Sequence, residues 1–196
     1  MTKYILIIAL GLLAFISTNF SKEIDVPLNK NIDYTNTKKA HFAGGCFWGV
    51  EHLFEKQKGV KDVISGYMGG HVKNPDYYGV IKGDTGHVET VEVVYNPNEI
   101  SYENLAKLFF EIHDPTQKNG QGPDIGSQYL SVVFYDNEEE KKTTEKLIEI
   151  LKTKGYDVAT TLKEKTPFYA AEGYHQDYYK RTGKTPYCHV YQKIFD

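Results

Sequence analysis

The sequence lacks the motifs by which most metal and nucleotide sites are recognised. It contains no CxxC pair, no HExxH and no clustered histidine–aspartate pattern, so we predict no metal site. It also contains no phosphate-binding loop and no dinucleotide fingerprint, which argues against a bound cofactor of that kind. No run of basic residues occurs and the net charge is −3, so we predict no nucleic-acid partner.

Long hydrophobic runs are scarce as well. One apolar stretch, residues 4–16, follows Lys3, and it is shorter than the ~20 residues that a membrane-spanning helix needs. This pattern is typical of a secretory signal, so we expect an exported, periplasmic or otherwise extracytoplasmic protein. The cleavage signature is poor, which leaves an uncleaved N-terminal anchor open. We assign residues 1–20 to this signal or anchor, 21–38 to a polar linker and 39–196 to one folded domain.

Cysteine is rare, and its two occurrences are Cys46 and Cys188. In an exported protein, two cysteines would by default form one structural disulfide. Cys46, however, lies between glycines where a short strand at residues 40–43 is followed by a helical pattern that begins at Phe47. Unpaired backbone N–H groups at a helix start favour a thiolate. We therefore interpret Cys46 as a nucleophile and keep the structural disulfide as the alternative.

The periodicity of the remaining chain predicts one α+β domain. Helices are expected to begin after Cys46, Ser101 and Asn137, and residues 172–181 are expected to be helical. The predicted strands are residues 40–43, 60–68, 87–95, 128–135 and 156–162. From residue 40 to residue 135 the order is β-α-β-β-α-β, which is the split βαβ of a ferredoxin-like two-layer sandwich. An added helix, an added strand and an irregular C-terminal tail follow.

Two loops of about fifteen residues, 71–86 and 113–127, are expected to carry function, because long loops in compact domains usually do. Tyr77 lies in the first loop and Tyr129 lies just after the second. Each tyrosine alone is more often a packing residue than a ligand. Asp124, in the second loop, has a simple turn role available to it.

Glu89 is the second unusual residue, because it shares a strand face with Val91 and Val93. If that face is buried, desolvation raises the pKa of the carboxyl toward the value that a general acid needs. A mixed, solvated face is the alternative, since the opposite face of this strand also bears valines. His175 is a candidate base for Cys46 but has no privileged spacing. Cys188, on the tail, could resolve an oxidised Cys46.

Five sequence blocks identify a family. They are GCFWG at 45–49, GDTGHVE at 83–89, HDPTQ at 113–117, GSQY at 126–129 and HQDY at 175–178. This ordered set, which extends from residue 40 to about residue 180, resembles the A-type peptide methionine sulfoxide reductases, a family specific for the S epimer of the sulfoxide. The resemblance implies an α+β two-layer fold and assigns residues 39–196 to the reductase domain.

Position by position, the resemblance assigns roles to the candidates. Cys46 corresponds to the nucleophile and Glu89 to the acid. Tyr77 and Tyr129 correspond to the tyrosines that hydrogen-bond the sulfoxide oxygen, and Asp124 to the aspartate that holds a water in the site.

The resemblance also implies a pocket and a catalytic cycle. Phe47 and Trp48 correspond to the pocket for the substrate methyl group, and His175 to a supporting residue. Methionine S-sulfoxide in oxidised proteins, and free methionine sulfoxide, would be reduced to methionine, leaving a sulfenic acid on Cys46. Cys188 would then form a redox-active disulfide with Cys46, and a thioredoxin-like donor would reduce it. The expected protein is a monomeric oxidoreductase without bound cofactor that repairs proteins under oxidative stress.

Two other functions stay open at this point. One is an exported binding module in which a Cys46–Cys188 disulfide is purely structural. The other is a different cysteine enzyme, such as a thiol hydrolase or acyltransferase, although no histidine here belongs to a recognisable nucleophile–base motif.

Overall fold

The structure is a computed structural model that describes residues 32–196. The predicted signal or anchor, residues 1–20, lies outside the described residues, as does the linker up to residue 31. Within residues 32–196, no helix has both the length and the apolar character needed to cross a bilayer.

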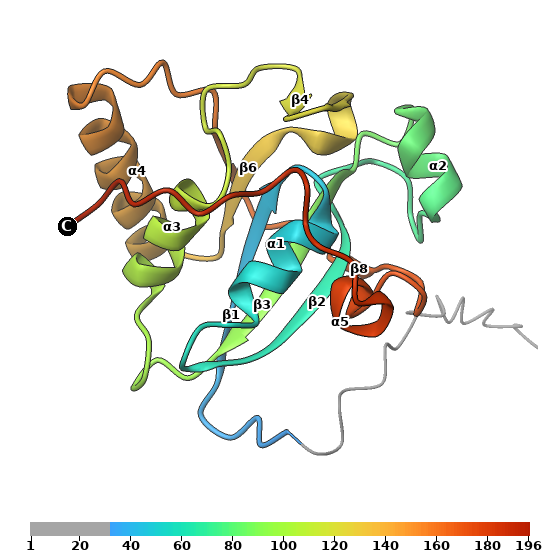
Figure 1. Cartoon of the computed structure of the whole chain (residues 1–196), viewed down its shortest axis with the longest axis horizontal. Helices are drawn as coiled ribbons and strands as arrows, with labels where there is room; N and C mark the ends of the chain where they lie inside the picture. The colour runs from blue at the N-terminus through green and yellow to red at the C-terminus, as the bar shows by residue number, and fades with distance from the viewer. Residues whose placement is uncertain (1–31) are drawn as a thin grey trace, which may run out of the picture.

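A six-stranded sheet forms the centre of the molecule (Figure 1). In spatial order its strands are β7 (Thr161–Glu164), β6 (Ser131–Tyr135), β1 (Lys38–Gly44), β3 (Val88–Tyr95), β2 (Val60–Met68) and β8 (Tyr169–Ala170). All pairings are antiparallel except that of β6 with β7. The central order β6-β1-β3-β2 is that of the ferredoxin-like split βαβ. The predicted α+β fold class is confirmed.

Three helices cover one face of this sheet: α1 (Phe47–Phe54), α3 (Tyr102–Glu111) and α4 (Glu138–Thr153) (Figure 1). The aromatic ring of Phe42, from β1, stacks on Phe54 of α1 and on Phe109 of α3, with ring centroids 5.2 Å apart in both pairs. Such offset aromatic contacts add to the gain from burying apolar surface. The core therefore fixes the start of α1 against the centre of the sheet.

The predicted helix starts are found where side chains cap them. The Ser101 hydroxyl accepts a hydrogen bond from the backbone N–H of Asn104, and the Asn137 side chain accepts one from Glu140. The Glu140 carboxylate in turn accepts from the N–H of Asp136, close to a capping box.

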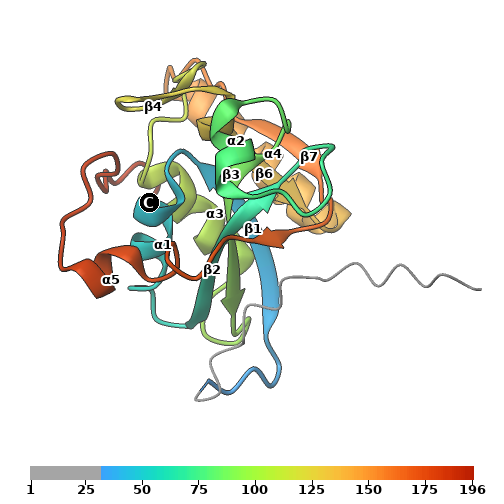
Figure 2. The same cartoon turned by 90° about the vertical axis from the view of Figure 1, so that its right-hand side faces the viewer.

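The other face of the sheet is covered by the segment that leads to β8. Phe168 packs against a smaller core of Met68, Val88 and Phe134. Figure 2 shows β8 beside β2 at the edge of the sheet, where the two strands pair. On this same face, Glu92 pairs with Lys39 and lies 2.9 Å from Nε2 of His41.

Several boundaries differ from the expectation. The second long loop contains a hairpin of β4 (Gly120–Gln121) and β5 (Asp124–Ile125), followed by a 3-10 turn, η1 (Ser127–Tyr129), so β6 begins three residues late. The last predicted strand, 156–162, was placed too early. The N–H of Ala159 donates to the carbonyl of Pro115 at 2.7 Å, which keeps that part of the chain out of the sheet.

The helical segment expected at 172–181 is reduced to α5 (Tyr178–Thr182). Asp177 lies in the left-handed region with φ 52°, and this interrupts a continuous helix. The preceding Gln176 uses its side chain to bind the backbone N–H and carbonyl of Ser65 on β2. In the first long loop, α2 (Tyr77–Lys82) starts after Asp76, which caps it by accepting from the N–H of Gly79.

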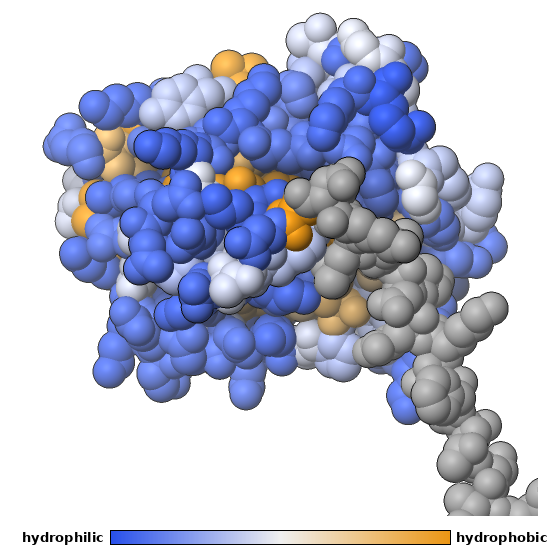
Figure 3. Space-filling view, turned by 90° about the horizontal axis from the view of Figure 1, so that it is seen from below, coloured by the Kyte–Doolittle hydropathy of each residue, from blue (hydrophilic) through white to orange (hydrophobic). Residues whose placement is uncertain are grey.

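The C-terminal tail, residues 184–196, has no helix or strand, as predicted, and crosses over α1 and α3 (Figure 1). Its end is held in place. The N–H groups of Ile194 and Phe195 both donate to one carboxylate oxygen of Glu111 at 2.8 Å. The ring of Phe195 is buried against Phe110. On the face seen in Figure 3, hydrophilic side chains predominate and hydrophobic ones are scattered among them.

Candidate active site

Cys46 lies at the helix start that the sequence predicted. It is the residue immediately before α1, and its side chain is 6% exposed. The backbone N–H of Trp48, in the first turn of α1, faces the Cys46 sulfur. Gly45 has φ +97°, and a Cβ there would lie 2.4 Å from the side chain of Gln121. Only glycine fits this turn, which aims the sulfur at the hairpin and the tail.

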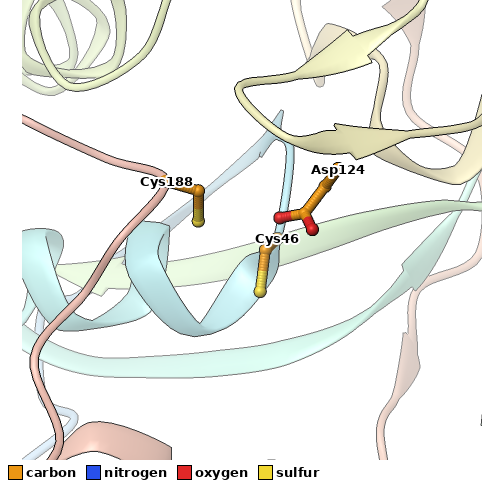
Figure 4. Close-up of side chains that lie close together, drawn as sticks. All are labelled: Cys46, Asp124 and Cys188. Carbon is orange, nitrogen blue, oxygen red and sulfur yellow. The ribbon is translucent and has the colours of Figure 1, made fainter.

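Three chain segments meet at this sulfur (Figure 4). The sulfur atoms of Cys46 and Cys188 and a carboxylate oxygen of Asp124 all lie within 4.8 Å of one another. Both cysteines are free thiols. Asp124 also accepts the hydroxyl of Tyr187 at 3.2 Å on each of its oxygens. The three atoms are close enough for a metal ion to bridge them, and the two free thiols are also close enough to form a disulfide with little movement.

The expectation of a thiolate on Cys46 is wrong while Cys188 lies beside it. The hydrogen bond between the two sulfur groups is the largest of several causes that raise the pKa of Cys46, and burial is the second. The N–H of Trp48 lowers this pKa, as a helix start should, but its effect is smaller. The arrangement therefore holds Cys46 as a thiol until Cys188 or a ligand changes its surroundings.

Glu89, on β3, is the acid nearest to the start of α1. It is 2% exposed, and one of its oxygens accepts the backbone N–H of Phe47 at 3.0 Å. Burial raises the pKa of Glu89 well above its usual value, and negative charge on Cys46 raises it further. The alternative of a solvated face does not hold, because Val91 and Val93 on the same face are fully buried. The raised pKa favours the protonated carboxyl, which can donate a proton.

Two predicted tyrosines surround the same carboxyl from short elements. Tyr77 opens α2 and Tyr129 ends η1. Burial raises the pKa of both phenols, and the charge of Glu89 is the next cause in each case, with Cys46 also contributing. Both hydroxyls therefore stay protonated at neutral pH and face the space around Glu89 and Cys46.

An aromatic wall continues from Trp48. Its indole N–H donates to Nδ1 of His175 at 3.1 Å, and its ring stacks on Tyr178 with centroids 3.8 Å apart. Phe47 is buried with its ring 5.1 Å from that of His175. His175 thus orients Trp48, and the contacts of its imidazole give it no part as a base for Cys46. The structure brings together all the residues that the sequence singled out.

The sequence did not single out a second layer of polar residues. The carboxylate of Glu172 accepts the hydroxyl of Tyr67 and the backbone N–H of Tyr77, both at 2.9 Å. Tyr67 is fully buried and pairs with Glu89 across the β2–β3 ladder. Neither residue has a signal in its local pattern, although Glu172 lies three positions before the His175 block.

Glu51 and His189 are two further buried polar residues that were missed. Glu51, on α1, is 2% exposed and accepts the N–H of Asp177, and burial raises its pKa to about 8. His189 lies beside Cys188 with its ring against the start of α1. Its position next to the second cysteine was the one available signal.

Comparison with known proteins gives consistent results. A family model described as peptide methionine sulfoxide reductase matches residues 38–195. Peptide methionine sulfoxide reductase MsrA of Nautilia profundicola is 49% identical over 150 residues, which are 76% of this chain and 87% of that protein. Reduced Mxr1 from Saccharomyces cerevisiae superposes with a TM-score of 0.77 at 36% identity, covering 83% of this chain and 97% of that one. Mxr1 in complex with Trx2 superposes with a TM-score of 0.56 at 26% identity, covering 83% and 96%.

Proposed function

The chain belongs to the peptide methionine sulfoxide reductase family, and from this membership we propose that it reduces the S epimer of methionine sulfoxide to methionine. The substrates are oxidised methionines in proteins, and free methionine sulfoxide as well. The single observation that carries the proposal is the buried carboxyl of Glu89, held by the N–H of Phe47 directly behind Cys46. A purely structural disulfide has no use for that carboxyl, and the family membership does not favour a different cysteine enzyme.

In the first half of the reaction, the Cys46 sulfur attacks the sulfur of the sulfoxide as a thiolate. Glu89 gives its proton to the sulfoxide oxygen, while the hydroxyls of Tyr77 and Tyr129 stabilise charge on that oxygen. Methionine leaves, and the oxygen remains on Cys46 as a sulfenic acid. The methionine sulfur gains two electrons and the Cys46 sulfur loses two, so the step needs no further oxidant or reductant.

The methyl group of the substrate lies against Phe47 and Trp48. The indole of Trp48 is suited to this role because it is fixed on two sides, by His175 and by Tyr178. A rigid aromatic wall holds the substrate sulfur at a constant distance from Cys46. Asp124, close to both cysteines, holds a water in the site.

In the second half, Cys188 attacks the sulfenic acid of Cys46 and forms a disulfide. A thioredoxin-like protein then reduces that disulfide by thiol exchange. The distance of at most 4.8 Å between the two sulfur atoms supports the first of these steps. The complex of the related Mxr1 with Trx2 supports the second.

We place this reaction outside the cytoplasm, on the basis of the apolar run at residues 4–16. An exported reductase needs a thioredoxin-like donor in the same compartment. The protein acts as a monomer that carries no bound cofactor and no metal.

The test is an epimer-resolved assay with dithiothreitol as reductant. The purified protein is incubated with the separate S and R epimers of a methionine sulfoxide peptide and of the free amino acid. We expect methionine from the S epimer and none from the R epimer. Release of an acyl group from an ester substrate, with no methionine from either epimer, would contradict the proposal.

A further inference from the structure

His189 is a buried residue for which the reaction described above has no use. It is 5% exposed although it lies on a tail without regular structure. Its imidazole bridges that tail and the segment before α1. Nε2 lies 2.8 Å from the carbonyl oxygen of Gly44, and Nδ1 lies 3.0 Å from the sulfur of Cys188.

These two contacts fix the tautomer of the ring. A carbonyl oxygen can only accept a hydrogen bond, so Nε2 of His189 must carry the hydrogen that Gly44 receives. In the neutral imidazole, Nδ1 then has a lone pair and no hydrogen. The thiol of Cys188 is consequently the donor, and its proton points at a nitrogen that can accept it.

The position of the His189 ring depends on the absence of a side chain at Gly49. Gly49 lies in the first turn of α1, and a Cβ there would be only 2.2 Å from Nδ1 of His189. No other residue would leave room for the imidazole at this place. The start of α1, which follows directly on Cys46, therefore also leaves the space that the His189 ring occupies. This fit is a second observation, independent of the hydrogen bonds.

The surroundings keep the ring neutral. Burial lowers the pKa of His189, while the charge of Asp124 acts in the opposite direction and favours a proton on the ring once one arrives. The sulfur atoms of Cys46 and Cys188 lie next to it. His113, whose pKa burial lowers to about 4, faces it from the end of α3 as a neutral group. The phenol of Tyr179 faces the two cysteines from α5.

We propose that His189 is the catalytic base of the second half-reaction, in which Cys188 attacks the sulfenic acid of Cys46. Nδ1 takes the thiol proton of Cys188, the Cys188 sulfur bonds to the Cys46 sulfur, and the S–O bond on Cys46 breaks. The oxygen leaves as water with the proton that the imidazolium returns. One sulfur is oxidised and the other reduced, so no other reactant is needed. The inference rests on the proposed function for its supply of sulfenic acid.

The experiment compares the wild-type protein with His189→Gln and His189→Asn in single turnovers without external reductant. Glutamine keeps a donor for Gly44, and asparagine keeps an acceptor near Cys188, but neither can take a proton. Methionine release, dimedone-trapped sulfenic acid and the mass of the disulfide form are followed in time. We expect the rate of disulfide formation relative to methionine release to fall about a hundred-fold at pH 7 in both variants, with sulfenic acid accumulating.

The pH profile separates a base from a structural support. At a pH well above ~8.5, where thiols ionise unaided, the variants should approach the wild-type rate of disulfide formation. An equal deficit at every pH, an unchanged rate in His189→Gln, or full rescue by His189→Asn would each overturn the inference. His41→Gln, which alters a buried histidine on the opposite face of the sheet, is the matched control and should keep the wild-type profile.

A parallel series tests the inference apart from the proposed function. Hydrogen peroxide converts a cysteine thiolate to sulfenic acid without any sulfoxide. A His189 effect on disulfide formation in this series supports the inference even if no methionine is released from a sulfoxide, a result that would refute the proposed function alone. The same disulfide rate in wild type and His189→Gln after peroxide would refute the inference alone.

Discussion

The side chains around Cys46 form two sets. The framework side comes from the helices and strands of the fold, and the tail side comes from the C-terminal tail. Glu89 is on the central strand β3, with Tyr77 and Tyr129 on short elements anchored beside it. Cys188 and His189 are on a segment without helix or strand, whose position depends on individual hydrogen bonds. In the proposed reaction, regular secondary structure holds the groups that bind substrate, whereas individual hydrogen bonds hold Cys188 and His189 beside Cys46.

The two sides also differ in how they control protons. On the framework side, burial raises the pKa of Glu89 and so favours its protonated form. The tail side keeps a proton on Cys46 by placing another thiol against it, and offers His189 as an acceptor beside Cys188. Burial is permanent, but the contact between the two thiols can be broken. In the proposed cycle, the pKa of Cys46 can therefore fall when its contact with Cys188 is broken, whereas burial keeps the pKa of Glu89 raised, so that Glu89 regains its proton after giving it up.

The largest effect is expected from a change on the tail side that leaves the framework side intact. In Cys188→Ser, we expect thioredoxin-driven turnover to be lost while each enzyme molecule still releases about one methionine, because the framework side is intact. Quench-flow measurement of methionine per enzyme, beside steady-state NADPH consumption with a thioredoxin system, checks this. Full turnover in the variant would show that Cys188 is not the resolving cysteine.

The converse change acts on the framework side. Glu89→Gln removes the acidic proton but keeps an acceptor for the N–H of Phe47, so we expect methionine release near neutral pH to slow by roughly 10²–10⁴. The rate of the first turnover is measured before any recycling. Glu92→Gln, on the opposite face of the same strand, is the control. An unchanged first-turnover rate in Glu89→Gln would remove Glu89 from the reaction.

A smaller effect is expected on the reactivity of Cys46 itself. Cys188→Ala removes the main cause of the raised pKa of Cys46 and leaves the N–H of Trp48, which lowers it. We expect the pH dependence of Cys46 alkylation by iodoacetamide to shift to lower pH, with roughly ten-fold faster labelling at pH 7 for each unit of pKa. Labelling of the Cys46 peptide is quantified by mass spectrometry. Slower labelling in the variant would contradict the assignment of Cys188 as the cause.

The smallest effect is expected on the pH dependence of stability, from Glu51, which belongs to neither the framework side nor the tail side. The pKa of Glu51 is about 8 in the fold and is ~4.3 in an unfolded chain. Between these values the unfolded chain loses the proton while the fold keeps it, so stability falls as pH rises, by at most about 1.4 kcal/mol per pH unit. Glu51→Gln should therefore stabilise the protein more at pH 8 than at pH 5 in urea unfolding, with no change in the first-turnover rate. A gain that is equal at both pH values would contradict this account.

Local patterns predicted the starts of α3 and α4 and the position of Cys46 before α1, because caps such as Ser101 and Asn137 act within three residues. The alternation of side chains along the strand placed Glu89 on the same face as Val91 and Val93, but it could not show that this face is buried. That depends on helices distant in sequence. The contact between Tyr67 and Glu172 joins residues 105 positions apart, and no local signal encodes it. The boundary of β7 was missed for the same reason, since the bond from Ala159 to Pro115 sets it.

The double hydrogen bond of Glu111 to the end of the tail has a consequence for the survival of the enzyme. By holding residues 194 and 195, it restrains the preceding segment, which carries Cys188 beside Cys46. A neighbouring group held in place acts at an effective concentration far above that of any dissolved reactant. In the proposed cycle, a sulfenic acid on Cys46 would then react with Cys188 before a peroxide molecule could convert it to the irreversible sulfinic acid. If the proposed cycle holds, a tail that lacks regular structure thus protects Cys46 from irreversible oxidation while the protein repairs oxidised methionines.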